Sequence, residues 1–364
     1  MSEKPLQLEE KREQPKFERP PIPVFGPTDS LFPEEEKQKV SEDLRERFSD
    51  GELTDLPESL ISEIKDLEYE KKSYEIDFIE ASNRIISQIR QKYGLPAFEV
   101  PAKNIHIIPP ELFKKLTNEP FVAMHDFRRQ IITANAGKFR FHDNRLPRAA
   151  TTFHEMEHLT GFLSLDIEQK GGTTNKKSYR RLGLMMSEGY RKSKKDEWYE
   201  SFRGLNEAVV SELEYKYEKE IAQSSSDPAT QEELQWLESE EAIKFKAKIG
   251  EDNETPVEEI EWVSKDGKNW INKSYRPQRR ALKYIVSQIS EDTGKSIEDI
   301  YDLFFKAHFT GNIREIADLI DSTFGPGQFR VIGMMTGDNQ SANQMLDHLR
   351  KQRIRIKKHE KDQD

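Results

Sequence analysis

The spacing of apolar residues in the first half of the chain predicts a helix followed by a small sheet. From Ser59 to Tyr93 apolar positions recur every three or four residues, which is typical of an amphipathic helix. Gly94 and Pro96 follow and are expected to end it. The next apolar segments are short and partly alternating, as in strands: 104–109, 121–127 and 129–137.

Helical spacing returns in the second half, interrupted by turn residues. A helix is expected to begin near Leu146 to Arg148, where a proline suits a first turn. Residues 179–202 predict a hairpin with a charged turn around Lys192 to Asp196, and Asp266-Gly267 predicts a second hairpin. The remaining helices are predicted at 205–222, from Pro228 to about Lys248, and, as a C-terminal bundle, at about 277–292, 297–308 and 313–323.

Composition adds long polar segments to this pattern. Charged residues make up 34% of the 364 residues and apolar residues another 34%, which indicates a modest core. Residues 1–55 are charged and rich in proline, so we expect them to be mostly disordered, with a short helix near 33–48. We therefore predict an α+β fold with disordered termini, organised as a disordered segment, a core, a helical subdomain and a basic tail: 1–55, 56–225, 226–338 and 339–364.

Net charge, apolar runs and cysteine content limit which partners, location and metal ligands the chain is expected to have. The formal net charge of -10 disfavours general affinity for nucleic acid, although the basic tail leaves a local contact open. The sequence shows neither a signal peptide nor an apolar run long enough to span a membrane, so a cytoplasmic protein is expected. With no cysteine, any metal must be held by His, Asp or Glu.

Residues 151–162, TTFHEMEHLTGF, carry the clearest chemistry. His154 and His158 are four residues apart, so on a helix both imidazoles can face one ion. Glu155 lies one residue round the helix from the first histidine, where a carboxylate can take a proton from water beside a metal. The stretch predicts a catalytic metal site that needs a third ligand.

The third ligand is expected on the helix that follows. The extended His-x-x-Gly-x-x-His pattern of metzincins fails, because residue 164 is Ser164. Glu207 in GLNEAVVSEL would complete a site of two histidines and a glutamate. Together with residues 154–158, the Asn-Glu-Ala stretch 206–208 resembles the glutamate zincins, thermolysin-like metallopeptidases in which such a segment supplies the third ligand. The resemblance covers about residues 100–220.

This resemblance implies one zinc ion per chain and a small mixed β-sheet over the motif helix, with the strands forming the upper wall of a substrate cleft. The family carries an orienting carboxylate four residues past the third ligand, where this chain has Ser211. Glu212, Glu214 or Asp166 are the alternatives for that role. Four residues remain open as donors to the oxyanion, namely Tyr190, Tyr215, Tyr275 and His308.

The sequence therefore predicts a zinc-dependent metallopeptidase that hydrolyses peptide or protein substrates, with Glu155 as general base. An alternative is an antirestriction-type or plasmid-associated zincin-like protein linked to DNA. The stretch 153–161 is similar to the His-Glu-x-x-His-x-Thr-Gly segment of those proteins, and the basic tail could contact DNA. A zinc-bound scaffold without turnover is the third possibility.

Overall fold

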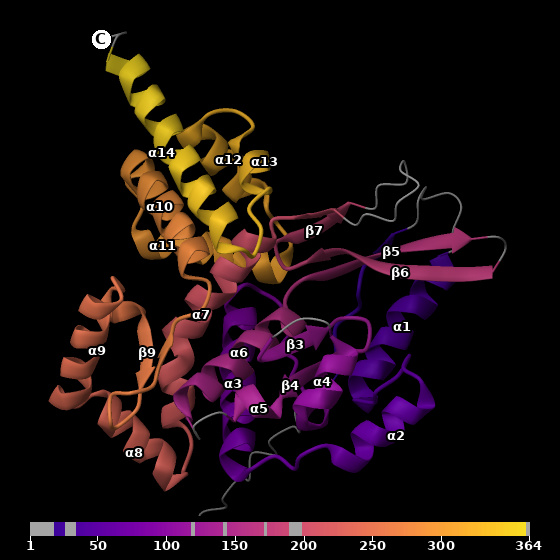
Figure 1. Cartoon of the computed structure of the whole chain (residues 1–364). Coiled ribbons are helices and arrows are strands. Elements are labelled where there is room, and N and C mark those ends of the chain that lie inside the picture. The colour runs from indigo at the N-terminus through magenta and orange to yellow at the C-terminus, as the bar shows by residue number, and fades with distance from the viewer. Residues whose placement is uncertain are drawn as a thin grey trace, which may run out of the picture.

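The structure is a computed structural model that describes residues 18–25, 34–117, 121–140, 144–170, 173–188 and 199–361. It confirms the predicted α+β class, with α3, α6 and α7 near the centre and the strands β5–β7 extending to one side (Figure 1). The α-helices are α1 (Glu34–Asp50), α2 (Glu58–Leu67), α3 (Ser73–Lys92), α4 (Pro110–Leu116), α5 (Ala136–Phe139), α6 (Leu146–Thr160), α7 (Arg203–Gln223), α8 (Pro228–Leu237), α9 (Glu240–Asp252), α10 (Arg276–Thr293), α11 (Ile297–Thr310), α12 (Arg314–Phe324), α13 (Gln328–Ile332) and α14 (Asn339–Lys361). The strands are β1 (Val24–Phe25), β2 (Ile105–Ile108), β3 (Ala123–Asp126), β4 (Ile131–Asn135), β5 (Leu163–Lys170), β6 (Thr173–Leu182), β7 (Met185–Glu188), β8 (Tyr199–Ser201), β9 (Ile260–Val263) and β10 (Trp270–Asn272).

The N-terminal region is more ordered than the sequence predicts. Helix α1 covers the short helix expected at 33–48 and buries Leu44 and Phe48. Residues 18–25, which we call the N-terminal strap, pass beside α1, and their strand β1 pairs in parallel with β5. The short helix predicted near 33–48 is therefore confirmed, and among the described residues the strap is ordered as well, because it packs against α1 and pairs with β5.

The helix predicted from Ser59 to Tyr93 is two helices. The break falls between α2 and α3, where Lys72 starts α3 and its N–H donates to the Glu75 carboxylate at 2.8 Å. A glutamate that accepts from the N–H preceding the helix in this way favours a helix start even where the apolar spacing continues. Helix α3 then packs with its buried face against α6.

A mixed three-stranded sheet, in the order β2-β4-β3, covers one side of α6. Its strands are the three predicted from the sequence. Strand β2 runs parallel to β4, and β3 runs antiparallel to it as an edge strand. This sheet brings the end of β3 against the helix that carries the two motif histidines.

A second sheet was not predicted as such. Its five strands lie in the order β1-β5-β6-β7-β8, and β5 and β6 form a long antiparallel ribbon that projects from the body (Figure 1). The hairpin predicted at 179–202 corresponds to β7 and β8, which pair antiparallel, while its charged turn lies outside the described residues.

Helices α8 and α9 with the β9–β10 hairpin form a lobe beside α7. The single polar helix predicted from Pro228 to Lys248 is divided, because the Ser239 hydroxyl accepts from the N–H of Ala242 and starts α9. The predicted hairpin at 260–271 is confirmed, with Gly267 at φ 67° in its turn.

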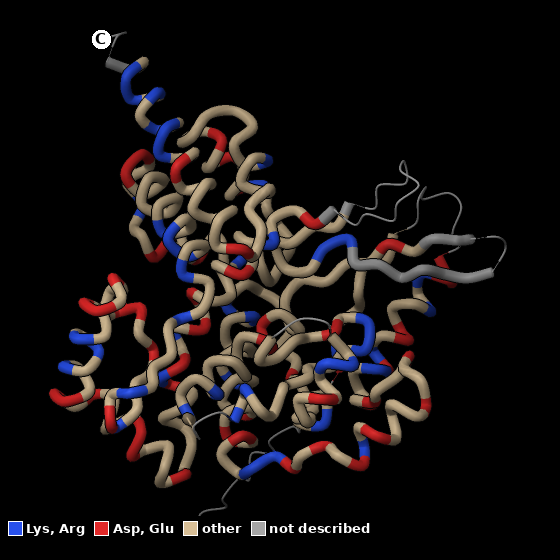
Figure 2. Tube along the Cα trace, in the orientation of Figure 1, with Lys and Arg blue, Asp and Glu red and all other residues tan. Residues whose placement is uncertain are grey.

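The C-terminal helices α10–α12 follow the prediction, and α14 packs against α10. The expected basic tail is therefore a helix, with Leu349 and Arg353 buried, although its outer end carries many cationic side chains (Figure 2). One apolar cluster extends from Phe48 to Leu349, so core and C-terminal helices share a single interior. None of the helices in the described ranges has the length and apolar character needed to cross a bilayer.

Candidate metal centre

Helix α6 is held at both ends by buried polar contacts. At its start the Glu233 carboxylate accepts from the N–H groups of Arg145 and Leu146, at 2.8 and 2.7 Å. At its end Arg19 of the N-terminal strap donates to the carbonyl of Leu159 (2.6 Å), and Arg90 of α3 donates to that of Thr160 (2.7 Å). These partners satisfy helix-end groups that would otherwise be buried unpaired, so α6 has a defined position.

Helix α7 is placed against α6 by its own first residues. Phe202 precedes it in the left-handed region (φ 64°), and its N–H donates to the carbonyl of Gly333 (2.7 Å). The N–H of Gly204 donates to the carbonyl of Met335 (2.8 Å). The start of α7 is thereby tied to the C-terminal helices, with Glu207 one turn further along.

His154, His158 and Glu207 form a compact buried cluster whose ligand atoms all lie within 4.8 Å of one another. Nε2 of His158 is 3.1 Å from Nε2 of His154 and 3.2 Å from Oε2 of Glu207. Nε2 of His154 is 3.4 Å from that same oxygen. Three ligands at tetrahedral zinc distances would be about 3.3 Å apart, so the three atoms have the spacing of one ion's ligands.

The electrostatics of the cluster also favour a cation. Burial opposes a charge on His154, but hydrogen bonds to Glu207 and Glu214 outweigh it and raise the pKa well above its usual value. Burial likewise opposes ionisation of Glu207, yet the two histidines lower the pKa of that carboxyl well below its usual range. Burial lowers the pKa of His158, which is therefore neutral. A divalent ion would replace the proton on Nε2 of His154, which faces Glu207, while the proton on Nδ1 stays with Glu214.

Both histidines are oriented by groups on α7. Nδ1 of His154 lies 2.9 Å from Oε2 of Glu214, and the Asn206 side-chain amide lies 3.3 Å from Nδ1 of His158. These contacts fall on the ring edges opposite the ligand nitrogens, where supporting partners of metal ligands are found. Of the alternatives for the orienting carboxylate, Glu214 takes the role. Glu212 instead pairs with Arg279 (2.9 Å), and Asp166 lies on the β5–β6 ribbon near Arg180.

Glu155 lies beside the cluster without joining it. Its Oε2 is 3.2 Å from Nδ1 of His125 on β3. Burial opposes ionisation of Glu155, but the His125 contact and the ligand histidines outweigh it and lower its pKa. Its carboxylate is therefore ionised and faces a cavity of about 370 Å³, whose lining includes Val122, Ala123, Thr151, Tyr275 and Asn339.

Tyr275 enters the same cavity from the other side. It precedes α10 at φ 51°, an uncommon backbone conformation for a bulky residue, and this conformation marks a position defined by its surroundings. Its ring lies nearly parallel (6°) to that of His154, with centroids 5.8 Å apart. The negative charge of Glu207, together with burial, raises the pKa of Tyr275, so the hydroxyl keeps its proton and can donate it in a hydrogen bond.

Of the other residues considered as oxyanion donors, His308 and Tyr215 do not line this cavity. His308 is fully buried beside His158, and burial lowers its pKa to about 3. Its Nδ1 lies 3.2 Å from Oδ1 of Asn206, and Gly183 passes so close to both that a Cβ there would collide with them. Tyr215 accepts a hydrogen bond from the N–H of Ser274 instead. Tyr190 lies outside the described residues.

Two further residues belong to the surroundings of the cluster. Glu157, between the two motif histidines, is fully buried, and burial raises its pKa well above the usual value. Helices α3 and α7 both pack on α6, so the side chain of Glu157 has no access to solvent. The sequence does not single out His125 as a site residue, and the signal that could have found it is its position near the end of the strand predicted at 121–127.

Comparisons with known proteins do not add a relative to this picture. No protein-family model, no curated protein and no solved structure matches the chain. The chemistry of the cluster itself, a buried group of two histidines and a glutamate that could hold a metal ion beside an ionised carboxylate, therefore carries the functional conclusion.

Proposed function

We propose that this protein is a zinc-dependent metallopeptidase that hydrolyses peptide or protein substrates in the cytoplasm. The observation that carries the proposal is the triangle of 3.1, 3.2 and 3.4 Å between the ligand atoms of His154, His158 and Glu207. A structural zinc site has four protein ligands, whereas a catalytic site has three and keeps the fourth position open. Among the described residues the cluster has three ligands and lies beside a cavity, which fits the catalytic kind.

Zinc is the ion that this set of donors favours. Two imidazole nitrogens and one carboxylate oxygen suit zinc better than magnesium or calcium, which bind oxygen ligands. The same set occurs in the glutamate zincins, the family that the His-Glu-x-x-His and Asn-Glu-Ala segments resemble. The mixed sheet over α6 supports a zincin-like fold, because its edge strand β3 lines the cavity above the motif helix.

The residues around the cavity can divide the chemistry of amide hydrolysis among them. Zinc held there would polarise the substrate carbonyl and lower the pKa of a water molecule. Glu155, ionised and facing the cavity, accepts a proton from that water and returns it to the leaving amine. Tyr275, which keeps its proton, donates a hydrogen bond to the oxygen that gains negative charge.

Strand β3 offers a place for the substrate backbone. Among the described strands β3 pairs only with β4, so its other edge is free to accept an extended peptide. Ala123 and the preceding Val122 line the cavity together with Glu155. A peptide added there would bring a carbonyl group toward the cluster of His154, His158 and Glu207.

The DNA-linked alternative has less support than the peptidase. Within the expected basic tail, Arg353 is committed to the interior, where its guanidinium donates to the carbonyl of Thr323 (3.1 Å) and pairs with Asp292. Of the cationic residues at the outer end of α14, Lys357 pairs with Glu291 at 2.7 Å. These contacts use side chains that a phosphate backbone would otherwise need.

The test compares the parent with Glu155→Gln, using Glu212→Gln as a control on the neighbouring helix. All three proteins should carry about one zinc per chain by plasma mass spectrometry, because neither substitution removes a ligand. Glu155→Gln should lose roughly 100- to 10,000-fold of peptide hydrolysis, since an amide cannot accept the proton from water. A zinc-loaded parent that cleaves no unfolded protein or peptide library, or a Glu155→Gln variant as active as the parent, would refute the proposal.

A further inference from the structure

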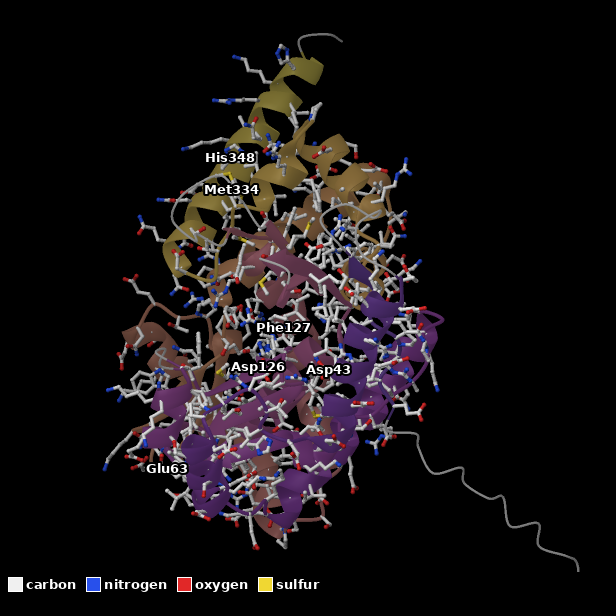
Figure 3. All side chains as sticks on the ribbon, turned by 90° about the vertical axis from the view of Figure 1, so that its right-hand side faces the viewer. Asp43, Glu63, Asp126, Phe127, Met334 and His348 are labelled. Atoms are coloured by element: carbon white, nitrogen blue, oxygen red, sulfur yellow. The ribbon has the colours of Figure 1, made fainter. Side chains whose placement is uncertain are left out.

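His125 occupies a rigid position at the end of β3. Its backbone pairs with Ile132 of β4, and the turn that follows is closed by the N–H of Gln130 donating to the carbonyl of Asp126 (2.7 Å). The Asp126 carboxylate accepts from the N–H of Arg128 at 2.9 Å. In Figure 3 Asp126 and Phe127 lie at mid-height, below Met334 and His348 of the C-terminal part and above Glu63 of α2.

Two contacts direct the His125 ring into the centre. One ring face stacks on His158, with centroids 4.5 Å apart and planes inclined by 24°. Its Nδ1 lies 3.2 Å from Oε2 of Glu155, and the side chain is 17% exposed against 11% for Glu155. Stacking on His158 thus fixes the plane of the His125 ring, and the contact with Glu155 fixes its rotation within that plane. Both partners lie on α6, whereas His125 lies on β3.

Glu155 has little else to hold its carboxylate. Within the described part of the chain, His125 is the hydrogen-bond partner of its Oε2, and Glu155 lines the cavity. A glutamate side chain on a helix has several rotamers, and a general base must keep its oxygen within hydrogen-bonding reach of the water it deprotonates. A donor that fixes Oε2 therefore determines where Oε1 points.

We propose that His125 is a positioning residue that holds the Glu155 carboxylate, through Nδ1–H, in the orientation needed for proton transfer. The inference rests on the proposed peptidase function and extends it to a residue outside both motifs. His125 donates one hydrogen bond to Oε2, and its stacking on His158 keeps this donor at a constant place relative to the metal ligands. It touches neither the ion nor the reacting atoms and acts through Glu155.

Two substitutions separate positioning from packing. His125→Phe keeps a flat ring against His158 but has no N–H, whereas His125→Asn gives up the ring and places a side-chain N–H close to the position of Nδ1. Loss of a hydrogen bond to a charged group should lower kcat of His125→Phe roughly 10- to 100-fold, with KM within about threefold of the parent. His125→Asn should recover kcat to within about threefold, and both variants should keep one zinc per chain.

A second measurement does not depend on activity. In zinc-loaded protein labelled with ¹⁵N-histidine, the His125 resonances, assigned by their loss in His125→Phe, should show a proton on Nδ1. That proton should lose its protection from solvent exchange in Glu155→Ala. A proton on Nε2 alone, or unchanged protection in Glu155→Ala, would overturn the inference.

The kinetic outcomes are equally decisive. If the parent is active and His125→Phe is equally active, His125 does not position Glu155. If His125→Asn loses as much activity as His125→Phe, a side-chain N–H at this place does not restore function, and the inference fails as well. An inactive zinc-loaded parent would instead refute the proposed function itself, and the inference with it.

Discussion

Replacing the carboxylates of α7 one at a time should rank them by their distance from the ion. Glu207 is the proposed third ligand, with Oε2 at 3.2 Å from Nε2 of His158. Oε2 of Glu214 lies 2.9 Å from Nδ1 of His154, on the ring edge away from the proposed ion. Glu212 points elsewhere and accepts a hydrogen bond from Arg279. Losing an orienting partner costs about 10- to 100-fold in metal affinity, so Glu214→Ala should fall in that range.

Glu207→Ala should lose more than about 100-fold, or more than about 2.7 kcal/mol, because it removes one of three bonds to the ion. Glu212→Ala should stay within about threefold of the parent, because Arg279 retains its 2.8 Å contact with Glu259. Competition with a chromogenic zinc chelator measures all three values, and circular dichroism checks that each variant is folded. Unchanged affinity in Glu207→Ala, or a Glu212→Ala variant as weak as Glu214→Ala, would refute this geometry.

Three further changes test other parts of the structure. Tyr275→Phe should keep zinc and lose roughly 100-fold in kcat for peptide cleavage. Arg19→Met should lower the free energy of unfolding, measured in urea, by about 2–3 kcal/mol, because it leaves the carbonyl of Leu159 without a donor. Burial raises the pKa of Glu218 to about 7 from an ordinary 4.5, so the folded state prefers its neutral form and loses stability as the pH rises from about 4.5 to 7. Glu218→Gln should therefore raise the melting temperature at pH 8 and change it little at pH 5; an equal change at both would contradict that assignment.

Local signals predicted those parts of the fold that depend on nearby residues. Helices α6, α7 and α10 begin within a few residues of their expected positions, because apolar spacing and first-turn prolines such as Pro147 act over one or two turns. The division into α2 and α3 was missed, since apolar residues on both sides keep a helical spacing. The β5–β6 ribbon was missed because its residues are mostly polar, and only pairing over many residues makes them strands.

The site divides in the same way. The spacing of His154 and His158 shows a shared helix face, and Glu214 falls seven residues after Glu207, on the same face of α7. His125 gives no such signal, because it is 30 residues from Glu155 and its side-chain direction depends on how β3 crosses α6. Burial of Glu157 is equally long-range, since it follows from α3 and α7 packing around the motif helix.

The strands β5 and β6 leave the interior and return to it at one point. The N–H of Phe162 donates to the carbonyl of His308 (3.0 Å), and the N–H of Gly183 donates to the carbonyl of Phe162 (2.7 Å). The β5–β6 ribbon between residues 162 and 183 therefore begins and ends at hydrogen-bonded residues. Its length has no influence on where α7 meets α6. A ribbon that closes on itself in this way can differ in length without moving His154, His158 or Glu207. The sequence separation of 49 residues from His158 to Glu207 therefore sets no distance between these two side chains, because the chain returns to Phe162 before α7 begins.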